Sequence, residues 1–146
     1  MTLQSIMSAG QKGAESAALE AATTLGLLAW GTVPKGWHKG ATEVYATNMV
    51  AHNGNAYPPC IECNVKAADG TLIVGKTDGP PGSLSLRACN IHQKPWIANP
   101  TGHQLVEWAA ENNVKTLHVS GSKTSDLYPD IETTTFAILL EAFGGL

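Results

Sequence analysis

Short apolar runs alternate with amphipathic segments along most of the chain, and glycine, proline, asparagine or serine stands between them. A short apolar run between such breaks predicts a buried strand, whereas apolar residues at 3.6-residue spacing, as at Ala14, Ala18, Ala21 and Leu25, predict a helix. The patterns predict strands at residues 3–7, 27–30, 71–74, 95–98 and 116–119. They predict helices at residues 14–25, 60–68, 82–92, 103–112 and 131–143.

The alternation of strands with helices indicates βαβ units, and therefore an α/β fold of three layers with a mainly parallel sheet. A length of 146 residues is typical of one domain, so we assign residues 1–146 to a single ligand-binding domain. Ligands of such folds bind outside the carboxyl ends of the strands. The loops that leave the strands should therefore converge there; they lie at 8–13, 31–40, 75–83, 99–102 and 120–125.

Residues 32–58 show little periodicity and are rich in glycine, proline, asparagine and histidine. A segment of this length without clear elements is typical either of a functional loop or of a disordered excursion.

The last predicted helix, 131–143, is apolar on more than one face. A helix of this kind is either deeply buried or shared with a second subunit. We expect one face to pack on the sheet and the other on a neighbouring subunit of a homo-oligomer, either a dimer or a tetramer. The two apolar sets are Ile131, Ile138, Leu139 and Ala142, and Phe136, Leu140 and Phe143.

Composition and charge narrow the classes of partner. The formal net charge is −3 and no run of lysine or arginine occurs, so the electrostatic pattern of a nucleic-acid-binding protein is missing. The apolar stretches are too short to span a bilayer, and the amino terminus lacks the features of a secretory signal. Three cysteines, an odd number, favour reduced thiols. We therefore expect a cytoplasmic protein whose partner is a small anionic ligand, not a nucleic acid or a membrane.

The segment Ser8-Ala9-Gly10-Gln11-Lys12-Gly13, between the first predicted strand and helix, is the first candidate site. Glycine lets the backbone approach an anion, and a helix amino terminus supplies unpaired N–H groups. Lys12 adds a full positive charge. The alternative is an ordinary turn that needs glycine for its dihedral angles. The segment is not a P-loop, because the Lys-Ser/Thr pair at the required spacing is absent.

Cys60 and Cys63, with Cys89 and His92 further along, form a rival constellation that could supply four ligands to a tetrahedral zinc ion. Both pairs fall within predicted helices, where thiols commonly behave as small buried hydrophobic groups. We expect reduced, metal-free cysteines and keep a zinc-stabilised interaction module as an alternative.

Several motifs, in order along nearly the whole chain, resemble those of the molybdenum carrier family, the carriers of molybdenum cofactor. The family opens with Gly-Gly-Gln-Thr-Gly-Val-Asp and an alanine-rich helix, which residues 8–19 resemble. Further matches are Val33-Pro34-Lys35-Gly36, Glu62, Asn64, Val65, Asp69, Thr71-Leu72-Ile73, Gly82-Ser83, Lys94-Pro95 and His118-Val119-Ser120-Gly121-Ser122.

The resemblance implies a Rossmann-like fold within the wider group that includes the lysine decarboxylase-like phosphoribohydrolases. It also implies a homo-oligomer, often a tetramer, that binds molybdenum cofactor or a molybdate- or tungstate-type oxyanion.

The chain departs from the family at several positions. Lys12 replaces a threonine and Glu15 an aspartate, while the expected arginines are replaced by Trp37-His38, Cys60 and Ser122-Lys123. Lysine cannot reproduce the bidentate fork of arginine. The cations left to compensate are Lys12, His38, Lys39 and Lys123.

The segment 79–86 resembles a degraded form of the phosphoribohydrolase loop Pro-Gly-Gly-x-Gly-Thr-x-x-Glu. Gly82 and Ser83 keep its anion-binding part, but Leu86 stands where the catalytic glutamate belongs. Hydrolysis of an N-glycosidic bond needs a carboxylate, for which Asp69 and Asp78 are the nearest substitutes in sequence. We therefore expect a binding protein without catalytic residues, and keep a phosphoribohydrolase-like enzyme as the first alternative.

The resulting hypothesis is a carrier that holds an anionic ligand at the carboxyl edge of the sheet. We expect the N–H groups of residues 10–13 and of Gly82 and Ser83 to contact the anion, Lys12 to reach it, and Lys35 or His38 to close over it. No resident metal site is expected. The expected ligand-binding residues are Ser8, Gly10, Gln11, Lys12, Gly13, Lys35, Gly36, His38, Asp69, Gly82, Ser83, Gly121, Ser122 and Lys123.

Overall fold

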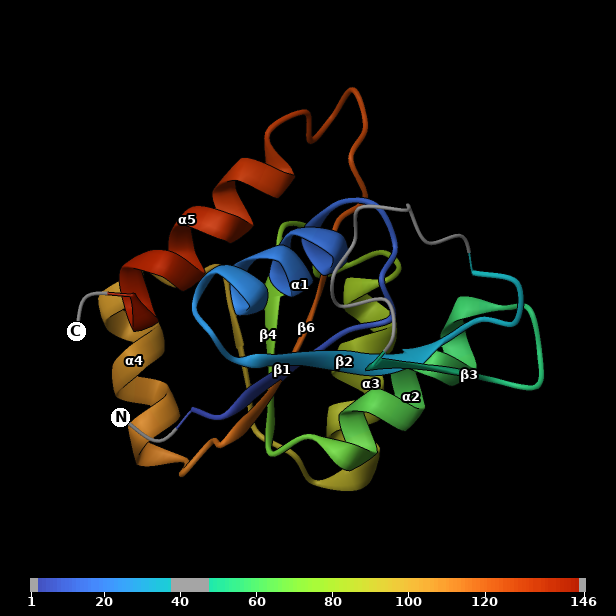
Figure 1. The fold of residues 1–146 in the computed structure, drawn as a ribbon, viewed down its shortest axis with the longest axis horizontal. Coiled ribbons are helices and arrows are strands. Elements are labelled where there is room, and N and C mark those ends of the chain that lie inside the picture. Colours follow the sequence, from blue (N-terminus) through green and yellow to red (C-terminus); the bar gives the residue numbers. More distant parts are fainter. Residues whose placement is uncertain (1–2, 38–47, 145–146) are drawn as a thin grey trace.

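The computed structural model describes residues 3–37 and 48–144, in which strands and helices alternate as the sequence predicts (Figure 1). The strands are β1 (Ser5–Met7), β2 (Leu28–Val33), β3 (Met49–Ala51), β4 (Gly70–Val74), β5 (Trp96–Ala98) and β6 (Thr116–Gly121). The helices are α1 (Ala14–Thr24), α2 (Tyr57–Ala67), α3 (Gly82–His92), α4 (Gly102–Glu111) and α5 (Ile131–Phe143).

The six strands form one sheet in the order β3-β2-β1-β6-β4-β5, and every pair is parallel. The mainly parallel α/β arrangement is therefore confirmed. The last strand, β6, lies in the middle, where His118 is in register with Met7 of β1 on one side and with Thr71 of β4 on the other. All carboxyl ends thus lie at one edge of the sheet, which we call the carboxyl edge.

Helices cover both faces of the sheet, which makes three layers. Helices α1, α4 and α5 lie together on one face, because α5 contacts both α1 and α4, while α2 and α3 contact each other on the opposite face (Figure 1). Small residues explain the close approach of α1 to the sheet, since Ala14, Ala18, Ala21 and Ala22 are completely buried.

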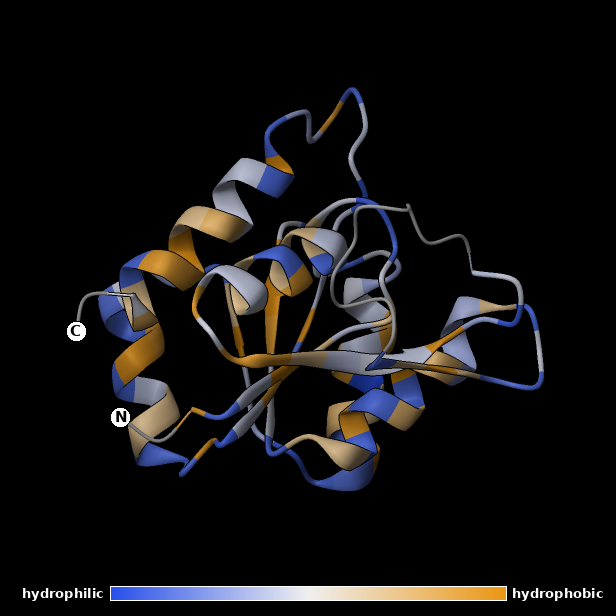
Figure 2. Cartoon of the chain, viewed as in Figure 1, coloured by the Kyte–Doolittle hydropathy of each residue, from blue (hydrophilic) through white to orange (hydrophobic). Residues whose placement is uncertain are grey.

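Two hydrophobic clusters hold the layers together. The larger one combines residues of β1, β4 and β6 with residues of α1, α4 and α5. The smaller one, beneath α2 and α3, consists of Ile61, Val65, Ala88 and Cys89. Figure 2 shows hydrophobic residues along the central strands and hydrophilic residues in the outer loops. The hydrophobic cluster beneath α2 and α3 is therefore the smaller of the two.

The closing helix α5 does not pack as the sequence suggested. It packs on α1 and α4 rather than directly on the sheet. Leu139 and Phe143 are buried in the larger cluster, and Phe136 and Leu140 pack against the same cluster from its margin. Both apolar sets of α5 thus contribute to the larger cluster, because α1 and α4 contact the helix from two sides, while Phe136, Ile138, Leu140 and Ala142 remain partly exposed.

No helix within residues 3–37 and 48–144 combines the length and the apolar character needed to cross a membrane.

Candidate functional site

The loop after β1 meets the loop after β2 at Gly10. The indole Nε1 of Trp37 donates a hydrogen bond to the carbonyl oxygen of Gly10 at 3.1 Å. Gly10 has a φ of +74°, and a Cβ there would lie 2.8 Å from Trp37 Nε1. The indole therefore lies directly against the glycine backbone, a contact that a larger residue would prevent.

The same glycine-rich loop meets the loop after β6. Gly13 and Lys123 form an antiparallel bridge, and the Ala14 amide donates a hydrogen bond to the carbonyl oxygen of Ser122 at 3.1 Å. Gly13 has a φ of +136°, and a Cβ there would lie 2.5 Å from that carbonyl oxygen. The bridge brings the backbones of Lys12 and Lys123 side by side, and both side chains are exposed.

Ser122 also anchors the loop after β4. Its hydroxyl oxygen accepts a hydrogen bond from the Lys76 amide at 2.9 Å. Next to it, the Asn99 side chain accepts from the Gly75 amide at 2.6 Å and donates to the Gly75 carbonyl oxygen at 2.9 Å, which ties in the loop after β5. The described parts of the five loops are thus joined by hydrogen bonds into one rim at the carboxyl edge, as the convergence argument predicts.

The backbone N–H groups of this rim are less available to a ligand than the sequence led us to expect. The Gly10 amide donates to Ser8 Oγ at 3.2 Å, and the Gly13 amide donates to Ser16 Oγ at 3.1 Å. The Ser83 amide, at the start of α3, donates to the Gly79 carbonyl oxygen at 3.0 Å. These N–H groups are held inside the chain, so the expected anion site at the amino terminus of α1 is largely filled by the protein's own oxygens.

Glu15, in the first turn of α1, is a site residue that the sequence analysis did not select. Its side chain is 1% exposed, and its Oε1 accepts a hydrogen bond from the Gln11 amide at 3.3 Å. Its Oε2 is buried and has no hydrogen-bond partner among the described residues. Burial raises the pKa of Glu15 to about 8, against the opposing effect of the Gln11 amide. The carboxyl is therefore mostly protonated at pH 7.

Two side chains of α2 lie within the electrostatic reach of Glu15. The pKa of Tyr57 is raised, mainly by burial and then by the Glu15 charge. The pKa of Cys60 is raised to about 11, mainly by burial, then by Cys63 and by Glu15. The buried carboxyl therefore stands between the glycine-rich loop and the start of α2. The sequence offered one signal for this residue, namely an acidic side chain directly after a glycine-rich loop. Its burial could not be expected, because glutamate is usually exposed.

Asp69 is not part of this rim. Its Oδ2 accepts hydrogen bonds from the amides of Lys115 and Thr116 at 3.0 and 2.9 Å, where β6 begins. Asp69 precedes β4, so it lies at the amino edge of the sheet, opposite the rim. The resemblance placed it in the site; the structure corrects this, because its carboxylate caps the start of a strand.

The other expected ligand-binding residues differ in how exposed they are to solvent. Ser8, Gly121 and Ser122 are buried parts of the rim, and Gly82 is buried at the start of α3 beside a half-buried Ser83. Lys35 and Gly36 follow β2 and are exposed. His38 lies outside the described residues.

The cysteines and His92 do not form a shared site in the described structure. Cys60 and Cys89 are buried, whereas Cys63 is exposed. His92 Nε2 lies 3.3 Å from Glu62 Oε1. Within residues 3–37 and 48–144, no group of three or more histidine, cysteine or acidic side chains could hold a metal ion. The described geometry gives the zinc alternative no support.

A group of buried polar side chains lies inside the molecule, on β6 and beside it. His118 Nδ1 lies 3.1 Å from Thr71 Oγ1, and burial lowers the pKa of His118 to about 3, so the ring is neutral at pH 7. His118 Nε2 and the hydroxyl oxygens of Ser85 and Ser120 are buried without partners in the described part of the chain. Such groups usually hold internal water.

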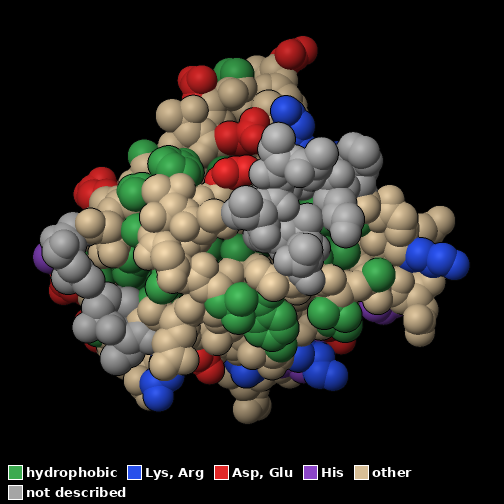
Figure 3. All heavy atoms as spheres, in the orientation of Figure 1, with side chains coloured by type: hydrophobic (Ala, Val, Ile, Leu, Met, Phe, Trp, Pro, Cys, Tyr) green, Lys and Arg blue, Asp and Glu red, His purple; other side chains and the backbone are tan. Residues whose placement is uncertain are grey.

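Positive charge around the rim comes from separate lysine side chains and not from one continuous basic patch. On the face drawn in Figure 3, the visible lysine and arginine side chains stand at separate places. Lys12 and Lys123 belong to the two backbone segments that the Gly13–Lys123 bridge joins.

Comparisons with known proteins agree with the fold and the motifs. A crystal structure named as a putative molybdenum carrier protein from Syntrophus aciditrophicus SB matches with a TM-score of 0.81 and 26% sequence identity. The match covers 97% of this chain and 95% of that chain, and it confirms both the Rossmann-like fold and the resemblance to molybdenum carriers. No curated protein matches. The model of the Circularly permutated YpsA SLOG family matches residues 6–143, and the chain therefore belongs to this family.

Proposed function

We propose that the protein binds a small oxyanion-bearing ligand at the carboxyl edge of its sheet and acts as a carrier. Molybdenum cofactor or a molybdate-type oxyanion is the ligand class that the family resemblance and the name of the structural neighbour favour. We also propose a cytoplasmic location, because the three free cysteines suit a reducing compartment.

One observation carries this proposal. The Gly13–Lys123 bridge holds two exposed lysines on neighbouring backbone segments, at the edge where ligands of parallel α/β folds bind. The amides of Gly10, Gln11 and Gly13 are committed within the chain, so we assign the attraction for an anion to the lysine ammonium groups. Point charges of this kind suit a compact oxyanion.

A neighbouring cavity supplies room for the organic part of a larger ligand. It has a volume of about 320 Å³ and lies between the ends of β4 and β5 and the loop before α5. This volume falls at the lower end of the range for small-molecule sites. Its lining includes Gly75, Asn99, Tyr128, Asp130 and Thr134.

The test is binding of molybdate to the purified protein by isothermal titration calorimetry, with Lys12→Ala and Lys123→Ala beside the wild type. Each lysine is exposed, so we expect each loss to weaken binding by about 5- to 30-fold, the equivalent of about 1–2 kcal/mol. Lys115→Ala, at the amino edge of the sheet, is the matched control and should change little. Equal effects of all three substitutions, or no binding by the wild type, would contradict the proposal.

The alternative function, a phosphoribohydrolase-like enzyme, gains one specific observation. Leu86 removes the carboxylate expected on α3, but the buried Glu15 supplies one beside the glycine-rich loop. A protonated buried carboxyl is a suitable general acid for glycosidic cleavage. Release of free base from nucleoside monophosphates, lost in Glu15→Gln, would favour the enzyme; intact substrate would favour the carrier.

A further inference from the structure

One carboxylate reaches both sides of the rim that the Gly13–Lys123 bridge joins. It belongs to Glu132, in the first turn of α5. Thr124 Oγ1 donates a hydrogen bond to Glu132 Oε2 at 3.1 Å, and Ser16 Oγ lies 3.4 Å from Glu132 Oε1. Thr124 follows β6, whereas Ser16 is in the first turn of α1. The two oxygens of one side chain therefore meet one hydroxyl group on each side of the bridge.

The same two residues hold the glycine-rich loop. Ser16 Oγ accepts a hydrogen bond from the Gly13 amide at 3.1 Å and lies 3.2 Å from the Gly13 carbonyl oxygen. The Thr124 amide donates to the Lys12 carbonyl oxygen at 3.2 Å. Through these two residues, the Glu132 carboxylate links α5 to the backbone segments of both rim lysines.

The charge of Glu132 does not explain its place at this rim. In the described part of the chain, neither Lys12 nor Lys123 forms an ion pair, so the half-buried carboxylate is held by hydroxyl groups and not by a lysine. Its negative charge by itself repels an anion that approaches the lysines. An acidic residue in the first turn of a helix also favours the helix dipole, which is the purely structural alternative.

We propose that Glu132 is a positioning residue of the anion site, which fixes the spacing of the two lysine-bearing segments without touching the anion. This inference rests on the function proposed above. With the carboxylate removed, the loop after β6 loses its tie to α5, and the glycine-rich loop loses the acceptor beside Ser16. A ligand then has to order both segments itself, and that ordering lowers its affinity.

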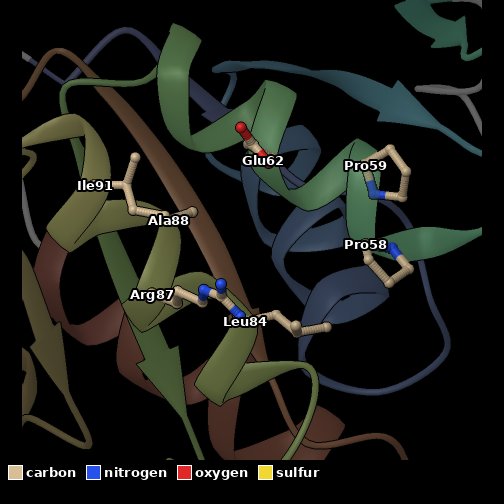
Figure 4. Close-up of a pocket in the computed structure, with 7 residues that line it drawn as sticks. All are labelled: Pro58, Pro59, Glu62, Leu84, Arg87, Ala88 and Ile91. Atoms are coloured by element: carbon tan, nitrogen blue, oxygen red, sulfur yellow. The ribbon is translucent and has the colours of Figure 1, made fainter.

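Two other glutamates provide matched controls for the loss of one negative charge. Glu20 lines the same groove between α1 and α5 as Glu132, but it is exposed to solvent. Glu62 lies on the opposite face of the sheet, where Figure 4 shows it on α2 above the hollow between α2 and α3. Its Oε1 lies 3.3 Å from Nε2 of His92, away from the rim.

The first experiment measures molybdate binding to Glu132→Ala and Glu132→Gln by isothermal titration calorimetry. Glutamine can accept from one hydroxyl group and donate to the other, but it carries no charge. Glu132→Ala should weaken binding by about 3- to 30-fold, whereas Glu132→Gln should bind at least as tightly as the wild type. Glu20→Ala and Glu62→Ala should stay within about twofold of the wild type. Tighter binding by both Glu132 variants would show a merely repelling charge and overturn the proposal.

The second experiment follows amide hydrogen exchange in the ligand-free protein, so it does not depend on the proposed function. Glu132→Ala should speed the exchange of the Gly13 and Thr124 amides by about 10-fold, and Glu132→Gln should not. Circular dichroism verifies the fold of each variant. Unchanged exchange in Glu132→Ala would refute the positioning role. A wild type that does not bind molybdate would contradict the proposed function alone, because the exchange result still decides whether Glu132 orders the rim.

Discussion

Replacing Glu15 by glutamine should change how the stability of the protein depends on pH. Its pKa rises from the ordinary value of 4.5 to about 8, chiefly because the carboxyl is buried. Between these pH values the native state holds a proton that the unfolded state releases. The free energy of unfolding therefore falls as pH rises through this window; the favourable contribution is complete below pH 4.5 and lost above pH 8.

His118 acts in the opposite direction at lower pH. Burial lowers its pKa from 6.5 to about 3, so its contribution to stability is complete above pH 6.5 and is lost as pH falls. The two effects offset each other between pH 4.5 and 6.5. The window from pH 6.5 to 8 therefore isolates Glu15, since Tyr57, Cys60 and Cys89 have pKa values raised above ordinary values of 9 or more.

The magnitude follows from about 1.4 kcal/mol for each tenfold change in proton affinity. Across the isolated window the wild type should lose about 2 kcal/mol. At pH 7, holding the proton that the unfolded carboxyl of Glu15 would release costs about 3 kcal/mol. Glutamine keeps the acceptor for the Gln11 amide and cannot ionise. Glu15→Gln should therefore be more stable at pH 7 by about 1–3 kcal/mol and should show a flat profile.

Urea denaturation, followed by circular dichroism at several values between pH 6.5 and 8, measures this directly. Glu20→Gln is the matched control, because Glu20 is an exposed glutamate on the same helix. It should keep the wild-type slope. A Glu15→Gln profile parallel to that of the wild type would refute the reasoning.

Four further substitutions or measurements test other parts of the structure. Gly13→Ala should lower the free energy of unfolding by about 2 kcal/mol or more, because its Cβ would meet a backbone carbonyl oxygen; Gly26→Ala, also at positive φ but with open space around it, should cost less in the same urea titration. Asp69→Ala should cost about 1–2 kcal/mol through the two amides that it caps, yet leave molybdate affinity unchanged. The imidazole of His118 should stay neutral in an NMR titration down to pH 4, and a midpoint near pH 6.5 would contradict its burial. Phe143→Glu should unfold the chain in thermal denaturation, because Phe143 is buried in the larger cluster; a stably folded monomer would contradict this placement.

Hydrophobic patterning was sufficient to predict the five helices and five of the six strands, including β5, which is apolar in sequence although its residues are not fully buried. It missed β3, a short edge strand whose residues are mostly exposed. It began α2 three residues late, because the proline-rich segment 32–58 shows little periodicity, whereas proline suits the first turn of a helix. It ended β2 too early at Gly31, which lies inside the strand.

The candidate site was predictable only in outline. Parallel strands bring their carboxyl ends together, so the convergence of the loops follows from the order of the elements. The use of the Ala14 amide does not, because it donates to the carbonyl oxygen of Ser122, more than a hundred residues away in the sequence. The burial of Glu15 likewise depends on tertiary contacts that no local pattern encodes. The place of Asp69 at the amino edge, in contrast, follows from its position before the predicted strand at 71–74.

The central place of β6 has a consequence for the order in which the chain can fold. Until residues 116–121 leave the ribosome, β1 can pair only with β2, and β4 only with β5. The nascent chain therefore holds two partial sheets with open edges, a state that favours aggregation or chaperone binding. Insertion of β6 closes both edges, and the residues that follow it bring Ser122 and Lys123 against Gly13. The rim is thus completed only after β6 has been inserted, and a ligand that needs both of its sides would stabilise only chains that have reached this stage.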